Sequence, residues 1–184
     1  MQLKLRRFES EIDTNKPFDC GDADLNDFLV ETSADTPNAT QFDKELLATT
    51  YVVEDGDSGK NVAYFSLLND KVEREIAEST TWNNLSRQIP NAKRRSSYPA
   101  LKIGRLAVCL EMRGLNIGTN IIKFISMLFS TRPVTGCRFI TVDAYNSAVG
   151  FYRKCDFKCL EQQDSHDETR LMYFDLKGIP HTRK

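Results

Sequence analysis

This chain of 184 residues lacks the features that mark several special classes of protein. Its formal net charge is −1, so it has no overall positive field to recruit nucleic acid or an anionic membrane. No segment approaches the roughly 20 apolar residues that a membrane span needs. The first seven residues are basic, but no apolar stretch follows them, so we expect no signal peptide.

Cysteine and histidine are also too sparse to suggest a metal site. The five cysteines (20, 109, 137, 155 and 159) form no Cys-x-x-Cys pair, and the two histidines, His166 and His181, lie in polar surroundings. We therefore expect no bound metal, surface histidines, and reduced, mostly buried thiols in a cytoplasmic protein.

What is present is the composition of an ordinary globular chain. It is 40% hydrophobic and 28% charged, and its length fits one domain over residues 1–184. Residues 70–97 are charged and then irregular, with Trp82 as their one large apolar anchor. We interpret this stretch as an insertion or lid within that domain.

The spacing of apolar residues predicts alternating strands and helices. Strands are expected at 3–8, 46–54, 61–68, 98–109, 137–144, 157–160 and 169–176, with a turn at 55–59 making the second and third a hairpin. Helices are expected at 20–30, 70–79, 146–154 and from 117 to the Arg132-Pro133 stop.

One stretch combines a strand, a tight loop and a helix start. The apolar run Ile103–Leu110 is typical of a buried strand. Residues 112–118 hold two glycines and an asparagine, and helical spacing begins at Ile117. Because the first turn of a helix has unpaired N–H groups and the positive end of the dipole, this arrangement predicts an anion site.

The loop resembles the pyrophosphate loop of GNAT-type N-acetyltransferases, Arg/Gln-x-x-Gly-x-Gly/Ala. Arg113-Gly-Leu-Asn-Ile-Gly118 matches that pattern with one departure, since Asn116 stands where glycine is usual. Asparagine tolerates a positive φ better than most residues, so we expect Asn116 to adopt one.

A second motif resembles the other half of the GNAT signature, Asn-x-x-Ala-x-x-Phe-Tyr-x-Lys-x-Gly-Phe. The matching residues are Asn146, Ala148 (one position early), Phe151, Tyr152, Lys154 and Phe157. Asp156 replaces the glycine that ends the helix, so we expect a positive φ there too. The two motifs carry the resemblance over residues 98–176.

Two further segments resemble a GNAT subgroup that includes toxins of toxin–antitoxin pairs. One is Phe18-Asp-Cys-Gly21 followed by Leu25-Asn-Asp-Phe-Leu29, and the other is Gly104-Arg-Leu-Ala-Val108. The resemblance implies an α/β GNAT fold. That fold is a mixed, twisted, mostly antiparallel sheet of six to seven strands flanked by helices, splayed at the fourth and fifth strands.

The resemblance also implies a site for acetyl-CoA. Leu106, Ala107 and Val108 would leave backbone groups for the pantetheine arm, which can pair with them like a strand. The pyrophosphate would bind the loop and helix start. These loop residues are Arg113, Gly114, Leu115, Asn116, Ile117, Gly118 and Thr119. Asn146 would contact the cofactor and Phe151 would line its slot.

Chemistry follows from the same resemblance. A neutral amine attacks the thioester directly, a backbone N–H near Val108 stabilises the oxyanion, and Tyr152 protonates the thiolate. The alternative for Tyr152 is a packed aromatic on an amphipathic helix. No general base is evident, because the central strand carries Arg105 and no carboxylate before Glu111.

The expected function is acetyl transfer to a primary amine of a small molecule, peptide or aminoacyl group. One alternative is toxin-like acetylation of aminoacyl-tRNA with an antitoxin partner, and another is a non-catalytic acyl-CoA-binding regulatory module. A local basic run at Lys93-Arg-Arg95, together with Arg105, could contact an RNA or an acidic substrate. A pI near 6.2 makes tRNA the less favoured substrate. Exposed strand edges would permit a homodimer.

Overall fold

The computed structural model describes residues 2–30, 37–89, 95–131, 135–160 and 168–179. Its residues cluster into two compact units, each assembled from two separate pieces of chain. Unit 1 comprises residues 1–68 and 103–121, and unit 2 comprises residues 69–102 and 122–184. The assignment of a single domain with an insertion at 70–97 stays a prediction.

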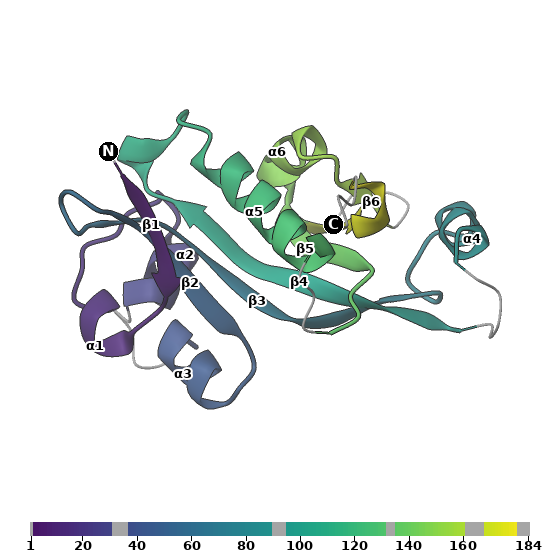
Figure 1. The fold of residues 1–184 in the computed structure, drawn as a ribbon, viewed down its shortest axis with the longest axis horizontal. Helices are drawn as coiled ribbons and strands as arrows, with labels where there is room; N and C mark the ends of the chain where they lie inside the picture. Colours follow the sequence, from purple (N-terminus) through teal and green to yellow (C-terminus); the bar gives the residue numbers. More distant parts are fainter. Residues whose placement is uncertain (1, 31–36, 90–94, 132–134, 161–167, 180–184) are drawn as a thin grey trace. The chain divides into compact units, whose positions relative to one another are not determined.

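Seven strands form one mixed sheet in the order β1-β2-β3-β4-β5-β7-β6 (Figure 1). The strands are β1 (Leu3–Arg7), β2 (Thr49–Asp55), β3 (Asn61–Glu73), β4 (Ser97–Val108), β5 (Phe139–Tyr145), β6 (Lys158–Cys159) and β7 (Thr169–Asp175). The β4–β5 pair is parallel, whereas β1–β2, β2–β3, β5–β7 and β6–β7 are antiparallel. This sheet, flanked by helices, confirms the predicted GNAT fold class.

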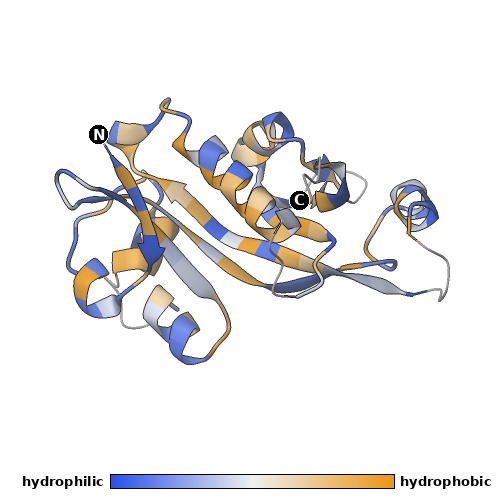
Figure 2. Ribbon diagram, viewed as in Figure 1, coloured by the Kyte–Doolittle hydropathy of each residue, from blue (hydrophilic) through white to orange (hydrophobic). Residues whose placement is uncertain are grey.

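The helices are α1 (Ser10–Asp13), α2 (Ala23–Val30), α3 (Ala39–Lys44), α4 (Ser79–Arg87), α5 (Ile117–Thr131) and α6 (Val149–Lys154). Short 3-10 turns cover Leu110–Met112, Asn146–Ala148 and Leu176–Gly178. Apolar and polar residues alternate around α5 in Figure 2, as its 3.6-residue spacing predicts. No helix among the described residues is long and apolar enough to cross a membrane.

An aromatic core holds unit 1 together. Phe28 of α2 is fully buried, stacks on Tyr64 of β3 with ring centroids 5.9 Å apart, and meets Phe42 of α3 edge-on. The Tyr64 hydroxyl donates a 2.6 Å hydrogen bond to the carbonyl of Leu25. Burial of such rings supplies most of the stabilisation, and the hydrogen bond satisfies the one polar atom that Tyr64 brings inside.

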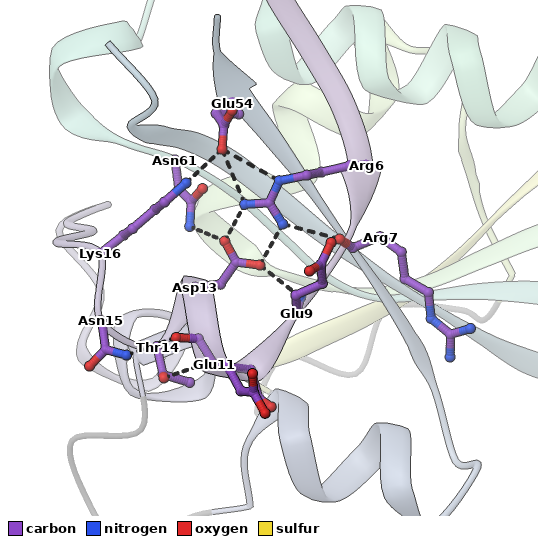
Figure 3. A network of polar contacts seen from close by, with 11 residues as sticks. Arg6, Arg7, Glu9, Glu11, Asp13, Thr14, Asn15, Lys16, Glu54 and Asn61 are labelled. Atoms are coloured by element: carbon purple, nitrogen blue, oxygen red, sulfur yellow. Dashed lines mark hydrogen bonds and ion pairs between the residues drawn. The ribbon is translucent and has the colours of Figure 1, made fainter.

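A charged network fastens β1 and α1 to the β2–β3 hairpin (Figure 3). The Arg6 guanidinium lies between the carboxylates of Asp13 and Glu54, and Lys16 reaches the same Glu54 at 2.6 Å. Asp13 is fully buried and also accepts from Asn61 Nδ2 at 3.0 Å. Burial alone would raise the pKa of Asp13, but its hydrogen bonds, above all that from Arg6, lower this pKa overall.

Unit 2 has its own core around α4. Trp82 stacks on Tyr98 with centroids 5.1 Å apart, and Tyr98 meets Phe139 of β5 edge-on. Leu85 of α4 is buried in the same cluster. The described part of the expected insertion therefore contributes to the core of unit 2, with Trp82 as its anchor.

The predicted helix at 70–79 is wrong. β3 continues to Glu73, because Val72 alternates inward to full burial while Lys71 and Glu73 share the opposite face and pair at 2.7 Å. The stretch after it was expected to be irregular, yet α4 forms there behind the N-cap Glu78. The helix expected from residue 20 begins only at Ala23, since Gly21 has a φ of +78°.

Leu46 ends α3 in a conformation that favours glycine. Its φ is +57°, and its side chain is 89% exposed, so it contributes almost no packing. We expect Leu46→Gly to raise the free energy of unfolding by about 0.5–1 kcal/mol, because relief of the left-handed strain exceeds the entropy cost of glycine. Urea denaturation measures this.

Leu47 supplies the matched control, since it is also exposed but has no positive φ. Leu47→Gly should lower stability by the ordinary cost of glycine. Equal effects of the two substitutions would contradict the strain at Leu46.

Candidate active site

The loop between β4 and α5 has the backbone of an anion cradle. Gly114 has a φ of +81° and Asn116 a φ of +59°, which confirms the positive φ expected at Asn116. A Cβ placed on Gly114 would meet nothing within 4 Å, so the space beside it is open.

The helix start supplies the donors. Asn120 donates its N–H to the Asn116 carbonyl at 2.9 Å, so the N–H groups of residues 117–119 precede the first intrahelical bond of α5. They lie at the positive end of a 15-residue helix. The loop and helix start therefore fit a pyrophosphate group.

Strand β4, which precedes the loop, pairs with the parallel strand β5 over only part of its length. β4 and β5 pair at Ala100↔Phe139, Leu101↔Ile140 and Lys102↔Thr141. Among the described residues no further β4–β5 pair occurs, although β4 runs on to Val108 and β5 to Tyr145. The parallel pairing of β4 with β5 is therefore confined to three residues of each strand.

The second motif lies in unit 2. Tyr152 of α6 is 6% exposed and meets Phe151 and Phe157 edge-on, with centroids 5.0 and 5.4 Å away. Burial raises the pKa of the Tyr152 phenol well above its ordinary value. Asp156 has a φ of +66°, as expected at the family's glycine position, and the N–H of Asn146 donates to the Glu168 carbonyl at 3.2 Å.

The predicted site residues thus fall into two groups. Unit 1 holds Leu106–Val108 and Arg113–Thr119, which follow one another along β4, the loop and α5. Unit 2 holds Asn146, Phe151 and Tyr152, which follow one another from the end of β5 into α6. Their roles stay predictions.

Sequence reasoning missed the polar side chains where the β4–β5 pairing ends. Thr141 is fully buried and its hydroxyl donates to Asp70 of β3. Lys102 pairs with Asp143 at 2.5 Å. Asp70 and Asp143 are carboxylates on strands, and their only signal in the sequence is alternation with apolar neighbours.

The Arg105 side chain contacts other residues of unit 1. Its guanidinium lies 4.0 Å above the Phe28 ring and 3.7 Å from the Asp24 carboxylate. Of the basic run, Lys93 and Arg94 lie outside the described residues, as do His166 and His181. No three His, Cys, Asp or Glu side chains of the described residues are placed to hold a metal ion.

A mixed sheet with a short parallel β4–β5 pair, followed by a positive-φ loop and a helix start, is the arrangement that the resemblance to GNAT acetyltransferases implies. Residues 88–176 match the family model described as an acetyltransferase (GNAT) domain. The matched residues contain both motifs, so this part of the chain is similar to GNAT acetyltransferase domains. A search of curated protein sequences gives no significant match.

The solved structures that resemble this chain include toxins. AtaT complexed with acetyl-methionyl-tRNAfMet aligns with a TM-score of 0.72 and 20% identity, covering 96% of each chain. A tyrosine-to-phenylalanine mutant of KacT aligns with a TM-score of 0.71, 20% identity and the same coverage. A tyrosine-to-phenylalanine mutant of AtaT, bound to the C-terminus of the antitoxin AtaR and acetyl-CoA, has a TM-score of 0.64 and 20% identity, covering 95% and 94% of the two chains.

Proposed function

We propose that this protein transfers the acetyl group of acetyl-CoA to a primary amine. The observation that carries the proposal is the cradle after β4, where two positive-φ residues, Gly114 and Asn116, lead into the N-terminus of α5. The AtaT structure with acetyl-CoA supports the same donor. Acetyl-CoA supplies an activated thioester, and the chain's own groups bind it and move protons.

Each group of residues has a proposed task. The N–H groups of residues 114–119 bind the pyrophosphate, Leu106–Val108 pair with the pantetheine amides, and Asn146 and Phe151 hold the cofactor. The N–H near Val108 donates to the thioester oxygen as negative charge develops there. Tyr152 donates its phenolic proton to the departing sulfur.

No side chain is assigned as general base. Glu111, the first carboxylate after β4 begins, is exposed on the 3-10 turn. An acceptor of low pKa, such as the α-amine of an aminoacyl ester, is largely neutral near pH 7 and needs no strong base. Aminoacyl-tRNA is therefore the second candidate acceptor, and the AtaT complex with acetyl-methionyl-tRNAfMet favours it.

Thermal unfolding with and without acetyl-CoA tests the cofactor site. Ligand that binds only the folded protein raises the midpoint by mass action, so millimolar acetyl-CoA should raise the wild-type midpoint. Gly118→Trp places a bulky ring in the first turn of α5 and should abolish that rise. Gly136→Trp, at an exposed glycine with open space around its Cβ, should keep it.

The absence of any rise in the wild type would overturn the proposal. Where the rise is present, a panel of amines and aminoacyl-tRNAs separates the acceptor classes by product formation. Binding of acetyl-CoA without turnover on any member would identify a non-catalytic acyl-CoA-binding module instead. Co-purification with a small partner from the native cell would support an antitoxin, as AtaR is for AtaT.

A further inference from the structure

The segment Asp19–Asn26 of unit 1, which we call the α2 turn, is built around one asparagine. Asn26 Oδ1 accepts the Cys20 N–H at 2.8 Å, and Asn26 Nδ2 donates to Asp19 Oδ1 at 3.0 Å. The same Asp19 oxygen accepts the Gly21 N–H at 2.8 Å, where the chain has a positive φ. One side chain therefore fixes where the carbonyl groups of Asp19 and Cys20 point.

Both carbonyl groups accept hydrogen bonds from the segment between β4 and α5, which is the candidate cofactor loop. The Leu110 N–H donates to the Asp19 carbonyl at 2.9 Å, and Arg113 Nη2 donates to the Cys20 carbonyl at 2.5 Å. The fit is close, since a Cβ on Gly21 would lie 3.2 Å from Leu110 Cδ2 and 3.8 Å from Arg113 Nη2. The α2 turn thus contacts the loop at both ends of the 3-10 turn that opens it.

Charge favours the same arrangement. Hydrogen bonds from the Gly21 N–H and from Asn26, together with the nearby Arg113 charge, lower the pKa of Asp19, so this carboxylate stays ionised beside the guanidinium. Asp19 therefore supplies a negative charge near Arg113 within unit 1. The guanidinium itself donates to the Cys20 carbonyl.

We propose that the α2 turn is a clamp that positions the cofactor loop, with Asn26 and the Arg113 side chain as positioning residues. Arg113 is followed by only three residues before α5 begins, so fixing its position also fixes Gly114 and Asn116 for the phosphates. The inference rests on the proposed function. It assigns a task to the Phe18-Asp-Cys-Gly segment, which the reaction itself does not use.

Asn26→Ala tests the clamp, and Asn38→Ala is its matched control. Asn38 caps α3 in the same unit by accepting the Gln41 N–H, so its loss also removes a side chain-to-backbone hydrogen bond. Calorimetry well below both unfolding midpoints should show the Kd for acetyl-CoA raised about fivefold by Asn26→Ala and unchanged by Asn38→Ala. Equal Kd values for the two variants would overturn the clamp.

A double-mutant cycle distinguishes a clamp from direct phosphate binding by Arg113. If Arg113 and Asn26 act through the same turn, Arg113→Met with Asn26→Ala should weaken binding no more than the stronger single variant. The salt dependence of Kd should stay that of the wild type. Additive losses, or a reduced salt dependence in Arg113→Met, would make Arg113 a ligand of the phosphates and overturn its positioning role.

Amide hydrogen exchange without ligand keeps this test separate from the proposed function. Asn26→Ala should speed exchange at residues 110–120, whereas Asn38→Ala should leave that segment protected as in the wild type. Unchanged exchange in Asn26→Ala overturns the clamp even where acetyl-CoA binds. A wild type that does not bind acetyl-CoA overturns the proposed function, and the exchange result still decides whether the turn holds the loop.

Discussion

Replacing Tyr152 with phenylalanine should lower kcat about 100-fold while leaving the KM for acetyl-CoA near its wild-type value. The substitution removes only the hydroxyl, so the ring contacts with Phe151 and Phe157 remain. What is lost is the proton donor to the departing sulfur, and general acid catalysis typically contributes a factor of about 100 or more. Steady-state kinetics with the best acceptor amine measures the change.

Tyr173→Phe is the matched control, because Tyr173 is also a buried tyrosine of unit 2, on β7 and outside both motifs. It should leave kcat unchanged. A wild-type kcat in Tyr152→Phe would show that this tyrosine only packs.

The pH dependence of the reaction rate is a second test of Tyr152 as the general acid. Because burial raises the pKa of Tyr152 above its ordinary value near 10, the phenol keeps its proton throughout the usual assay range. The rate should therefore rise with pH as the acceptor amine loses its proton, and should not fall again below about pH 10. A descending limb near neutrality would assign the acid role to another group.

Arg6→Met should destabilise the folded protein by about 3–5 kcal/mol, measured by urea unfolding at pH 7. The substitution leaves the fully buried Asp13 carboxylate without its cation, and an uncompensated buried charge costs about that much. Methionine keeps most of the apolar stem, so the loss reports the charge rather than a cavity.

The neighbouring residue provides the control. Arg7 pairs with Asp43, but both side chains are well exposed, at 59% and 39%, and Arg7 points away from the network in Figure 3. Exposed pairs contribute little, so Arg7→Met should change stability far less. Similar losses from both substitutions would contradict the special role of the buried pair.

The deficit of Arg6→Met should shrink as the pH falls. In the wild type the folded pKa of Asp13 is lowered, so its contribution is present above the unfolded pKa of about 3.9 and disappears as the pH falls through the folded pKa. In the variant the lowering by Arg6 is lost, so the folded pKa of Asp13 is higher than in the wild type and protonation relieves the buried charge at a higher pH. The two stability curves should converge toward acid pH.

The parts of the fold that the sequence predicted are those with regular spacing. The 61–68 run of apolar residues became β3, the spacing from Ile117 became α5, and the substituted family positions Asn116 and Asp156 both took the positive φ that their place required. Local chemistry dictates such features, so a single sequence is enough to find them.

What the sequence could not give depends on partners far along the chain. By their charge, residues 70–73 are typical of a solvated helix. In the structure Asp70 accepts a hydrogen bond from Thr141, and Val72 is buried in the core around α4. The α2 turn is similar. In the sequence, Asn26 resembles any polar residue on a short helix. The hydrogen bonds from Leu110 and Arg113 to the α2 turn join residues more than 80 positions apart, so the sequence does not show them.

The interleaving of the two units has a consequence for how the chain is made. Unit 1 needs residues 103–121 as well as residues 1–68, and unit 2 begins within the gap between these pieces. A ribosome that has delivered the first 68 residues has delivered the aromatic core of unit 1 without β4, and the turn at Asp19 has no loop to hold. The full set of residues of unit 1 is therefore available for folding only after Ile121 has left the exit tunnel.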